Sequence, residues 1–171
     1  MLDNALAHSG AATTALERPR ALGAILYGGL AVGILDGLAA VILTLVNGRS
    51  PTRMFQSIAS GLLGRDSYNG GLTTALLGVL LHFLIAFIFT TIYYGASLKL
   101  PMLIRRVALW GPIYGVAVYF AMQCIVLPLS AIRKPPFSFA APVQGIIVHI
   151  LCVGLPIAFF AARSAKMTKT D

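Results

Sequence analysis

The chain has 171 residues, of which 58% are hydrophobic and only 11% charged. Soluble domains carry about 25% charged residues, so this composition excludes a soluble protein and predicts a multi-pass membrane protein with short loops. The net charge of +8 does not indicate nucleic-acid binding, because the cations are scattered over the segment flanks and form no basic run. The two cysteines, Cys124 and Cys152, fall in apolar segments and predict no disulfide framework.

A polar N-terminal tail, residues 1–20, precedes the first apolar segment, and we expect it to stay uncleaved because it lacks the pattern of a signal peptide. Four apolar segments then reach the roughly 20 residues that a helix needs to span the hydrocarbon core. Because backbone groups in lipid must bond to one another, these segments are predicted to be helices. The prediction is an all-α, four-helix transmembrane bundle over residues 21–163, with spans at 22–46, 72–96, 107–129 and 142–162 and a basic C-terminal tail at 164–171.

The distribution of lysine and arginine predicts the orientation of the bundle. Eight of these residues lie in the two tails and the connection between the second and third spans, and five lie in the other two loops. Cytoplasmic segments carry the excess of cations, so both termini are predicted to be cytoplasmic.

The first loop contains a predicted amphipathic helix over residues 51–64. Ser50 followed by Pro51 is typical of a helix start, and Gly64 can end the helix. Met54, Phe55 and Ile58 fall on an apolar face, and Gln56, Ser57 and Ser60 fall on the opposite one. This helix could brace the bundle, or it could act as a gate or a docking surface.

Small residues on two spans predict close helix packing. In the first span these glycines share a face with a carboxylate, Asp36, which is costly to bury in hydrocarbon. In the third span they precede Tyr119 and Gln123 on an i+4 stripe. The packing glycines are Gly29, Gly33 and Gly37 in the first span and Gly111 and Gly115 in the third.

Two pairs of segments resemble each other and predict an internal duplication of one helical hairpin. The second and fourth spans both contain glycine, three aliphatic residues, histidine, an apolar residue and leucine, with the histidines at His82 and His149. In the first and third spans a Tyr-Gly pair begins nine positions before Asp36 and before Gln123, respectively. Two hairpins with the same orientation form a parallel repeat.

The duplication places Asp36, His82, Gln123 and His149 at similar depths, and we expect them to form a buried polar layer. This layer could be structural, tying helices together, or it could serve the transport of a small solute or an ion. The alternative is a metal or haem site that uses His82 and His149 with Cys152. No catalytic motif is present, so no catalytic residue and no enzymatic activity are expected.

Three segments resemble a group of uncharacterised bacterial four-span inner-membrane proteins: residues 57–64, the histidine-bearing second span, and Leu127-Pro-Leu-Ser130 at the end of the third span. The resemblance implies a location in the bacterial inner membrane and assigns no activity and no cofactor. The partner expected from the sequence is the lipid bilayer, with a homo-oligomer left open and nucleic acid excluded.

Overall fold

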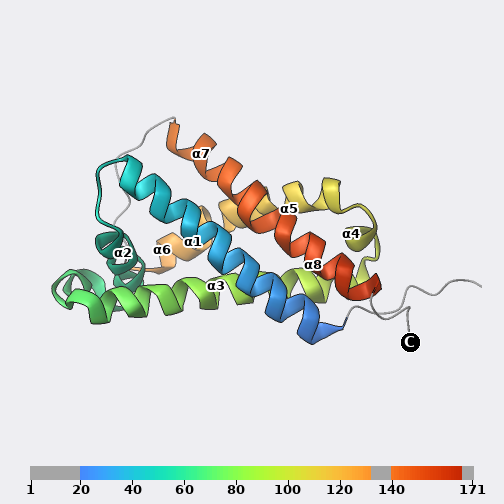
Figure 1. The fold of residues 1–171 in the computed structure, drawn as a ribbon, viewed down its shortest axis with the longest axis horizontal. Coiled ribbons are helices and arrows are strands. Elements are labelled where there is room, and N and C mark those ends of the chain that lie inside the picture. The colour runs from blue at the N-terminus through green and yellow to red at the C-terminus, as the bar shows by residue number, and fades with distance from the viewer. Residues whose placement is uncertain (1–19, 132–139, 167–171) are drawn as a thin grey trace, which may run out of the picture.

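The computed structural model describes residues 20–131 and 140–166, and every element within these ranges is a helix. Four of them are long and apolar enough to cross a membrane: Gly23–Val46, Gly71–Lys99, Val107–Leu129 and Pro142–Ala165. They lie alongside one another in an elongated bundle, with a short helix, α2, at one end (Figure 1). The predicted all-α four-helix bundle is therefore confirmed.

The spans are assembled from α-helices and shorter π-helical segments. In chain order the elements are a π-helical segment Gly23–Tyr27, α1 Gly28–Val46, α2 Pro51–Leu63, a 3-10 helix Gly64–Asn69, α3 Gly71–Lys99, α4 Met102–Arg105, α5 Val107–Ala121, a π-helical segment Met122–Val126, α6 Leu127–Leu129, α7 Ala140–Val148, a π-helical segment His149–Gly154, and α8 Leu155–Lys166.

Two helices continue past their predicted ends at the end of the bundle that holds α4. Helix α3 runs to Lys99 and α8 runs to Lys166, into the predicted C-terminal tail. Near these ends Ser97, Ser164 and Ala165 are buried, so the additional turns pack within the bundle. Residues 1–19 of the predicted N-terminal tail and residues 167–171 of the C-terminal tail lie outside the described residues.

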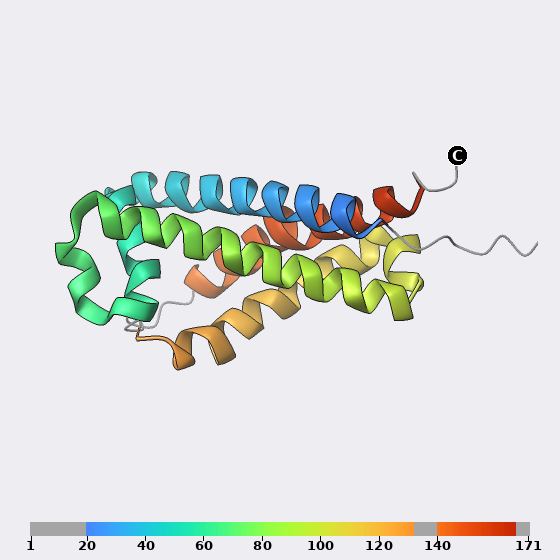
Figure 2. The ribbon, with the colours of Figure 1, turned by 90° about the horizontal axis from the view of Figure 1, so that it is seen from below.

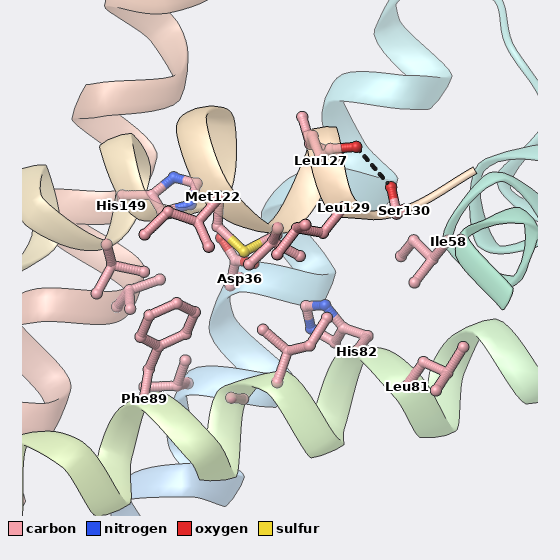
Figure 3. A pocket seen from close by; sticks show the side chains of 18 of the residues that line it. Asp36, Ile58, Leu81, His82, Phe89, Met122, Leu127, Leu129, Ser130 and His149 are labelled. Carbon is pink, nitrogen blue, oxygen red and sulfur yellow. Dashed lines mark hydrogen bonds between the residues drawn. The ribbon is translucent and has the colours of Figure 1, made fainter. Parts of the chain in front are cut away.

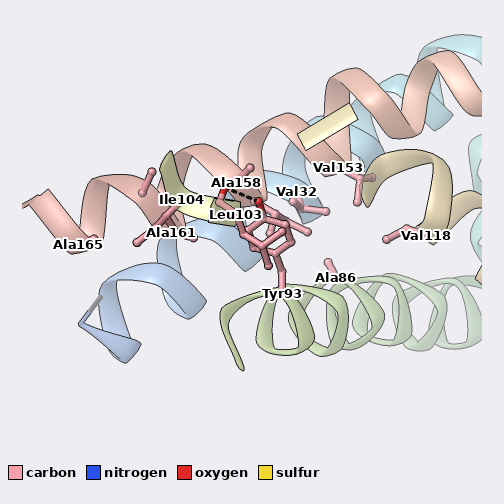
Figure 4. Close-up of a cluster of buried hydrophobic side chains, with 12 residues drawn as sticks. Val32, Ala86, Tyr93, Leu103, Ile104, Val118, Val153, Ala158, Ala161 and Ala165 are labelled. Atoms are coloured by element: carbon pink, nitrogen blue, oxygen red, sulfur yellow. Dashed lines mark hydrogen bonds between the residues drawn. The ribbon is translucent and has the colours of Figure 1, made fainter. Parts of the chain in front are cut away.

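The hydrophobic core is concentrated at this same end (Figure 4). Tyr93 of α3 and Ile157 and Ala158 of α8 are each no more than 1% exposed. The Tyr93 hydroxyl donates to the carbonyl of Leu103 in α4, at 3.0 Å, and the Tyr93 ring contacts Tyr114 edge to face at 4.8 Å. A buried tyrosine needs such a partner for its hydroxyl, and the contact with Leu103 satisfies the hydroxyl of Tyr93.

The predicted packing glycines lie at helix contacts. A Cβ atom on Gly29 or Gly33 of α1 would collide with the rings of Phe87 and Phe83 on α3. A Cβ atom on Gly115 of α5 would lie 2.5 Å from the backbone oxygen of His149. Gly37 and Gly111 also face neighbouring helices, at His82 and at Leu155 with the Gly154 backbone, respectively. Small residues at these positions therefore set the close approach of the helices.

Two of the π-helical segments precede prolines. The segment Met122–Val126 ends two positions before Pro128, and His149–Gly154 ends two positions before Pro156. A proline inside a helix removes one N–H donor and crowds the carbonyl four residues earlier. A wider turn in front of the proline relieves this crowding and changes which residues share a face.

Helix α2 begins and ends as the sequence predicts. The Ser50 side chain accepts a hydrogen bond from the Arg53 backbone N–H at 3.5 Å, and Gly64 ends the helix with a φ of 60°. However, α2 turns its polar and small residues inward. Gln56, Ala59 and Ser60 are buried, and the Gln56 amide donates to the Gly71 carbonyl of α3 at 2.9 Å.

Candidate functional site

A cavity of about 580 Å³ lies inside the bundle, at the end that holds α2. Side chains from α1, α3, α5 and the fourth span line it together with α2, as Figure 3 shows. Most of these residues are aliphatic, and the ionisable ones are Asp36, His82 and His149. The volume falls in the range of about 300–1,000 Å³ that is usual for small-molecule pockets.

Asp36 supplies the single carboxylate of the cavity wall. It lies in α1 ten residues before the helix ends at Val46, which corresponds to roughly 15 Å along the helix axis. The residue is half-buried, and within residues 20–131 and 140–166 no hydrogen bond or ion pair is formed by its carboxylate. Asp36 and His82, although both belong to the predicted polar layer, are thus not hydrogen-bonded to each other in the described part of the chain.

His82 instead joins two helices. Its Nε2 lies 3.0 Å from the carbonyl oxygen of Gly33, so an α3 side chain binds the α1 backbone one turn before Asp36. A carbonyl only accepts hydrogen bonds, so Nε2 carries the proton in this contact. In the neutral ring the other nitrogen, Nδ1, is then an acceptor.

His149 reaches the cavity from the first residue of its π-helical segment. Its Nδ1 donates to the carbonyl of Gly145 on the same helix at 2.8 Å, and its ring contacts the Tyr119 ring edge to face at 5.5 Å. By the same reasoning its Nε2 is an acceptor in the neutral ring. The two histidines therefore share a cavity, although their hydrogen-bond partners differ.

Gln123 does not join this group: the residue is exposed and is not part of the cavity wall. The i+4 stripe from Gly111 is buried as far as Tyr119, but Gln123 belongs to the π-helical segment, where the α-helical spacing no longer holds. Beyond the contact between Tyr119 and Gly145 the α6 and α7 helices diverge (Figure 1). Met122, the preceding residue, lines the cavity instead.

Helix α2, for which the sequence left open a brace, a gate or a docking surface, forms the end wall of the cavity. Ser57, Ile58 and Leu62 of α2 line the cavity together with Ser130, which follows α6. The backbone N–H of Ala131 donates to the carbonyl of Gly61 at 3.3 Å. This bond fastens the end of the third span to α2, and Figure 2 shows α6 ending beside α2.

A glycine of α3 lets α2 approach it closely, in addition to the hydrogen bond between Gln56 and Gly71. A Cβ atom on Gly78 would overlap the backbone carbonyl of Phe55, so the two helices touch backbone to backbone. Gly78 is four residues before His82 in the repeated motif, and its counterpart Gly145 meets the Tyr119 ring. The motif glycines thus place both histidine-bearing helices close to a neighbour.

The residues predicted for a metal site are not gathered at one point. His82 and His149 both line the cavity, but Cys152 does not. In the described ranges no group of three or more histidine, cysteine or acidic side chains is placed to hold a metal ion. A zinc site takes at least three protein ligands, and the alternative of a metal or haem held by His82 and His149 stays a prediction.

Comparisons with known protein families, with curated proteins and with solved structures find no match to this chain. The four apolar spans show a multi-pass membrane protein, and its role has to be argued from the cavity.

Proposed function

We propose that the protein binds a small, largely apolar solute carrying one cationic N–H group and transfers it across the membrane. The observation that carries this proposal is the unpaired carboxylate of Asp36 on the wall of a mostly aliphatic cavity, within the described part of the chain. A charge at such depth calls for a partner of opposite sign. The role is one of binding and transfer rather than catalysis.

The two histidines also favour a solute that carries N–H donors. With Nε2 of His82 and Nδ1 of His149 bonded to carbonyls, the second nitrogen of each neutral ring accepts hydrogen bonds. The polar groups of the cavity wall are then the Asp36 carboxylate, one acceptor nitrogen on each histidine, and the hydroxyls of Ser57 and Ser130, which donate to the carbonyls of Met54 and Leu127. A guanidinium or ammonium group presents several N–H donors and no acceptor, and it complements this set in charge and in hydrogen bonding.

An uptake assay tests the proposal. Purified protein in liposomes should take up hexylguanidinium, which stays protonated and therefore crosses bare lipid slowly. Asp36→Asn should reduce the rate to that of empty liposomes. Asp66→Asn is the matched control, because Asp66 is an exposed carboxylate outside the cavity. Uptake that is equal in all three proteins would refute a transport role for Asp36.

A purely structural polar layer gives a different result. In that case Asp36→Asn and His82→Ala would lower the unfolding temperature of the protein, and no protein-dependent uptake would be measured. His82 holds α3 to α1 through the Gly33 carbonyl, so some loss of stability is expected from His82→Ala in either case. The Asp36→Asn variant therefore separates the two roles.

We also propose that the protein resides in the bacterial inner membrane with both termini in the cytoplasm. The support is the excess of lysine and arginine on that side of the spans and the resemblance of the sequence to bacterial four-span proteins. Reporter fusions at Lys99 and at the C-terminus should both report a cytoplasmic position. An external signal at either site would contradict the proposed orientation.

A further inference from the structure

One polar side chain of the third span faces away from the interior of the bundle. Gln123 is exposed, and within residues 20–131 and 140–166 its amide forms no hydrogen bond. Its neighbours Met122 and Val126 line the inner cavity, so Gln123 lies on a different side of the same helix. In Figure 2 this part of the third span, drawn in orange, lies at the outer edge of the bundle.

Gln123 lies within the apolar part of its span. It precedes the end of the span at Leu129 by six residues, which corresponds to roughly 9 Å along the helix axis. The side chains beside it are apolar, and among them Phe120 is 53% exposed and Ile125 is 57% exposed. Acyl chains offer neither donors nor acceptors, so an amide left without a hydrogen-bond partner at this depth is costly. The position therefore calls for a polar group from another molecule.

Gln123 also continues an exposed stripe along the third span. Leu109, Ile113, Ala117 and Phe120 follow one another at spacings of four, four and three residues, and all of them are exposed. Residues at these spacings share one face of a helix. Ala117 is small, and small residues allow membrane helices to approach each other closely. The stripe is therefore suited to packing against another helix, with an amide near one end.

We propose that this stripe, from Leu109 to Gln123, is the contact between two copies of the protein in the membrane. A second copy inserts with the same orientation, so a two-fold axis along the membrane normal places its Gln123 at the same depth. A glutamine amide carries two donors and an acceptor, and two such amides can bond reciprocally across a two-fold axis. A second copy thus presents a matching polar group where lipid presents none. The proposal concerns the outer face of the span and does not depend on the solute of the inner cavity.

Energy transfer between labelled copies tests this contact. Full-length protein labelled at the C-terminus with a donor or an acceptor is reconstituted in liposomes over a range of protein-to-lipid ratios. We expect the wild type to form dimers with a saturating dependence on this ratio. Gln123→Leu should raise the midpoint about tenfold, which corresponds to about 1.4 kcal/mol and lies in the range for hydrogen bonds between membrane helices. Gln123→Asn keeps an amide and should form dimers more readily than Gln123→Leu.

The matched control is Gln144→Leu, because Gln144 is also an exposed amide but lies only two residues after its span begins at Pro142. It should form dimers as the wild type does. Ala117→Phe is a second test, since a bulky ring on the stripe should weaken the dimer. Ala117 and Gln123 are both exposed, so neither variant should change the unfolding temperature of the monomer in detergent. A wild type that is monomeric at every ratio, or an equal midpoint for wild type and Gln123→Leu, would overturn the proposal.

Discussion

Replacing Gly78 with alanine should loosen the end wall of the inner cavity. The added methyl group would overlap the Phe55 backbone carbonyl, and a backbone atom cannot move aside by rotating a side chain. Helix α2 must therefore shift as a body. This shift would also strain the hydrogen bond from the Gln56 amide to the Gly71 carbonyl.

The magnitude follows from three contributions. Overpacking a close contact costs about 1–3 kcal/mol, and a weakened hydrogen bond costs about 0.5–1.5 kcal/mol. The higher helix propensity of alanine offsets about 1 kcal/mol of this. We therefore expect Gly78→Ala to destabilise the folded protein by about 0.5–3.5 kcal/mol.

Gly95→Ala is the matched control, because Gly95 lies in the same helix and nothing lies within 4 Å of its added Cβ atom. It should leave stability unchanged or raise it by up to about 1 kcal/mol. The first assay is thermal unfolding in detergent. The second introduces Ile58→Cys into a background without the natural cysteines and measures how fast an impermeant maleimide labels this probe. Equal unfolding temperatures and equal labelling for the two alanine variants would refute the backbone contact between α2 and α3.

Two further comparisons test the packing of the spans. Gly154→Ala should destabilise the protein by about 1–3 kcal/mol, because its Cβ atom would meet the Gly111 carbonyl and the Gly115 backbone. Gly33→Ala should cost less, since the Phe83 ring it meets can rotate; thermal unfolding of both variants checks this order. His82→Ala should lower the free energy of unfolding by about 0.6–2 kcal/mol. His149→Ala should lower it by less, because only the His82 hydrogen bond joins two helices. Equal losses for the two histidine variants would contradict that assignment.

The positions of the spans and of α2 could be predicted from the sequence because they depend on local properties. Segment length and hydropathy determine whether a helix can cross the bilayer, and the Ser50-Pro51 start and the Gly64 end are read directly from residue type. The packing glycines were predicted for a related reason. Their lack of a side chain is what permits the contacts seen at Gly29, Gly33 and Gly115.

The direction in which each helix faces was harder to predict. Lipid is as apolar as a protein interior, so an apolar stripe on a helix does not tell its buried side from its exposed side. Helix α2 shows the consequence: Gln56 and Ser60 are buried, whereas Leu63, which does not line the cavity, is 44% exposed. Polar side chains that can form hydrogen bonds within the bundle face inward, and leucine side chains can contact lipid.

The site was predictable in part for the same reason. Asp36, His82 and His149 all line the cavity, as the cost of exposing them to lipid suggests. Gln123 was grouped with them on helical spacing, and the π-helical segment before Pro128 breaks that spacing. Pro128 is the residue in the sequence that indicates a disturbed i+4 spacing in the turns before it.

The most direct test of the cavity's role is equilibrium binding of hexylguanidinium to the protein in nanodiscs, measured by calorimetry against empty nanodiscs. We predict saturable binding by the wild type and by Asp66→Asn. Asp36→Asn should bind at least about tenfold more weakly, which corresponds to about 1.4 kcal/mol. Unchanged affinity in Asp36→Asn, or no saturable binding by the wild type, would contradict the proposal that the cavity holds a cationic solute.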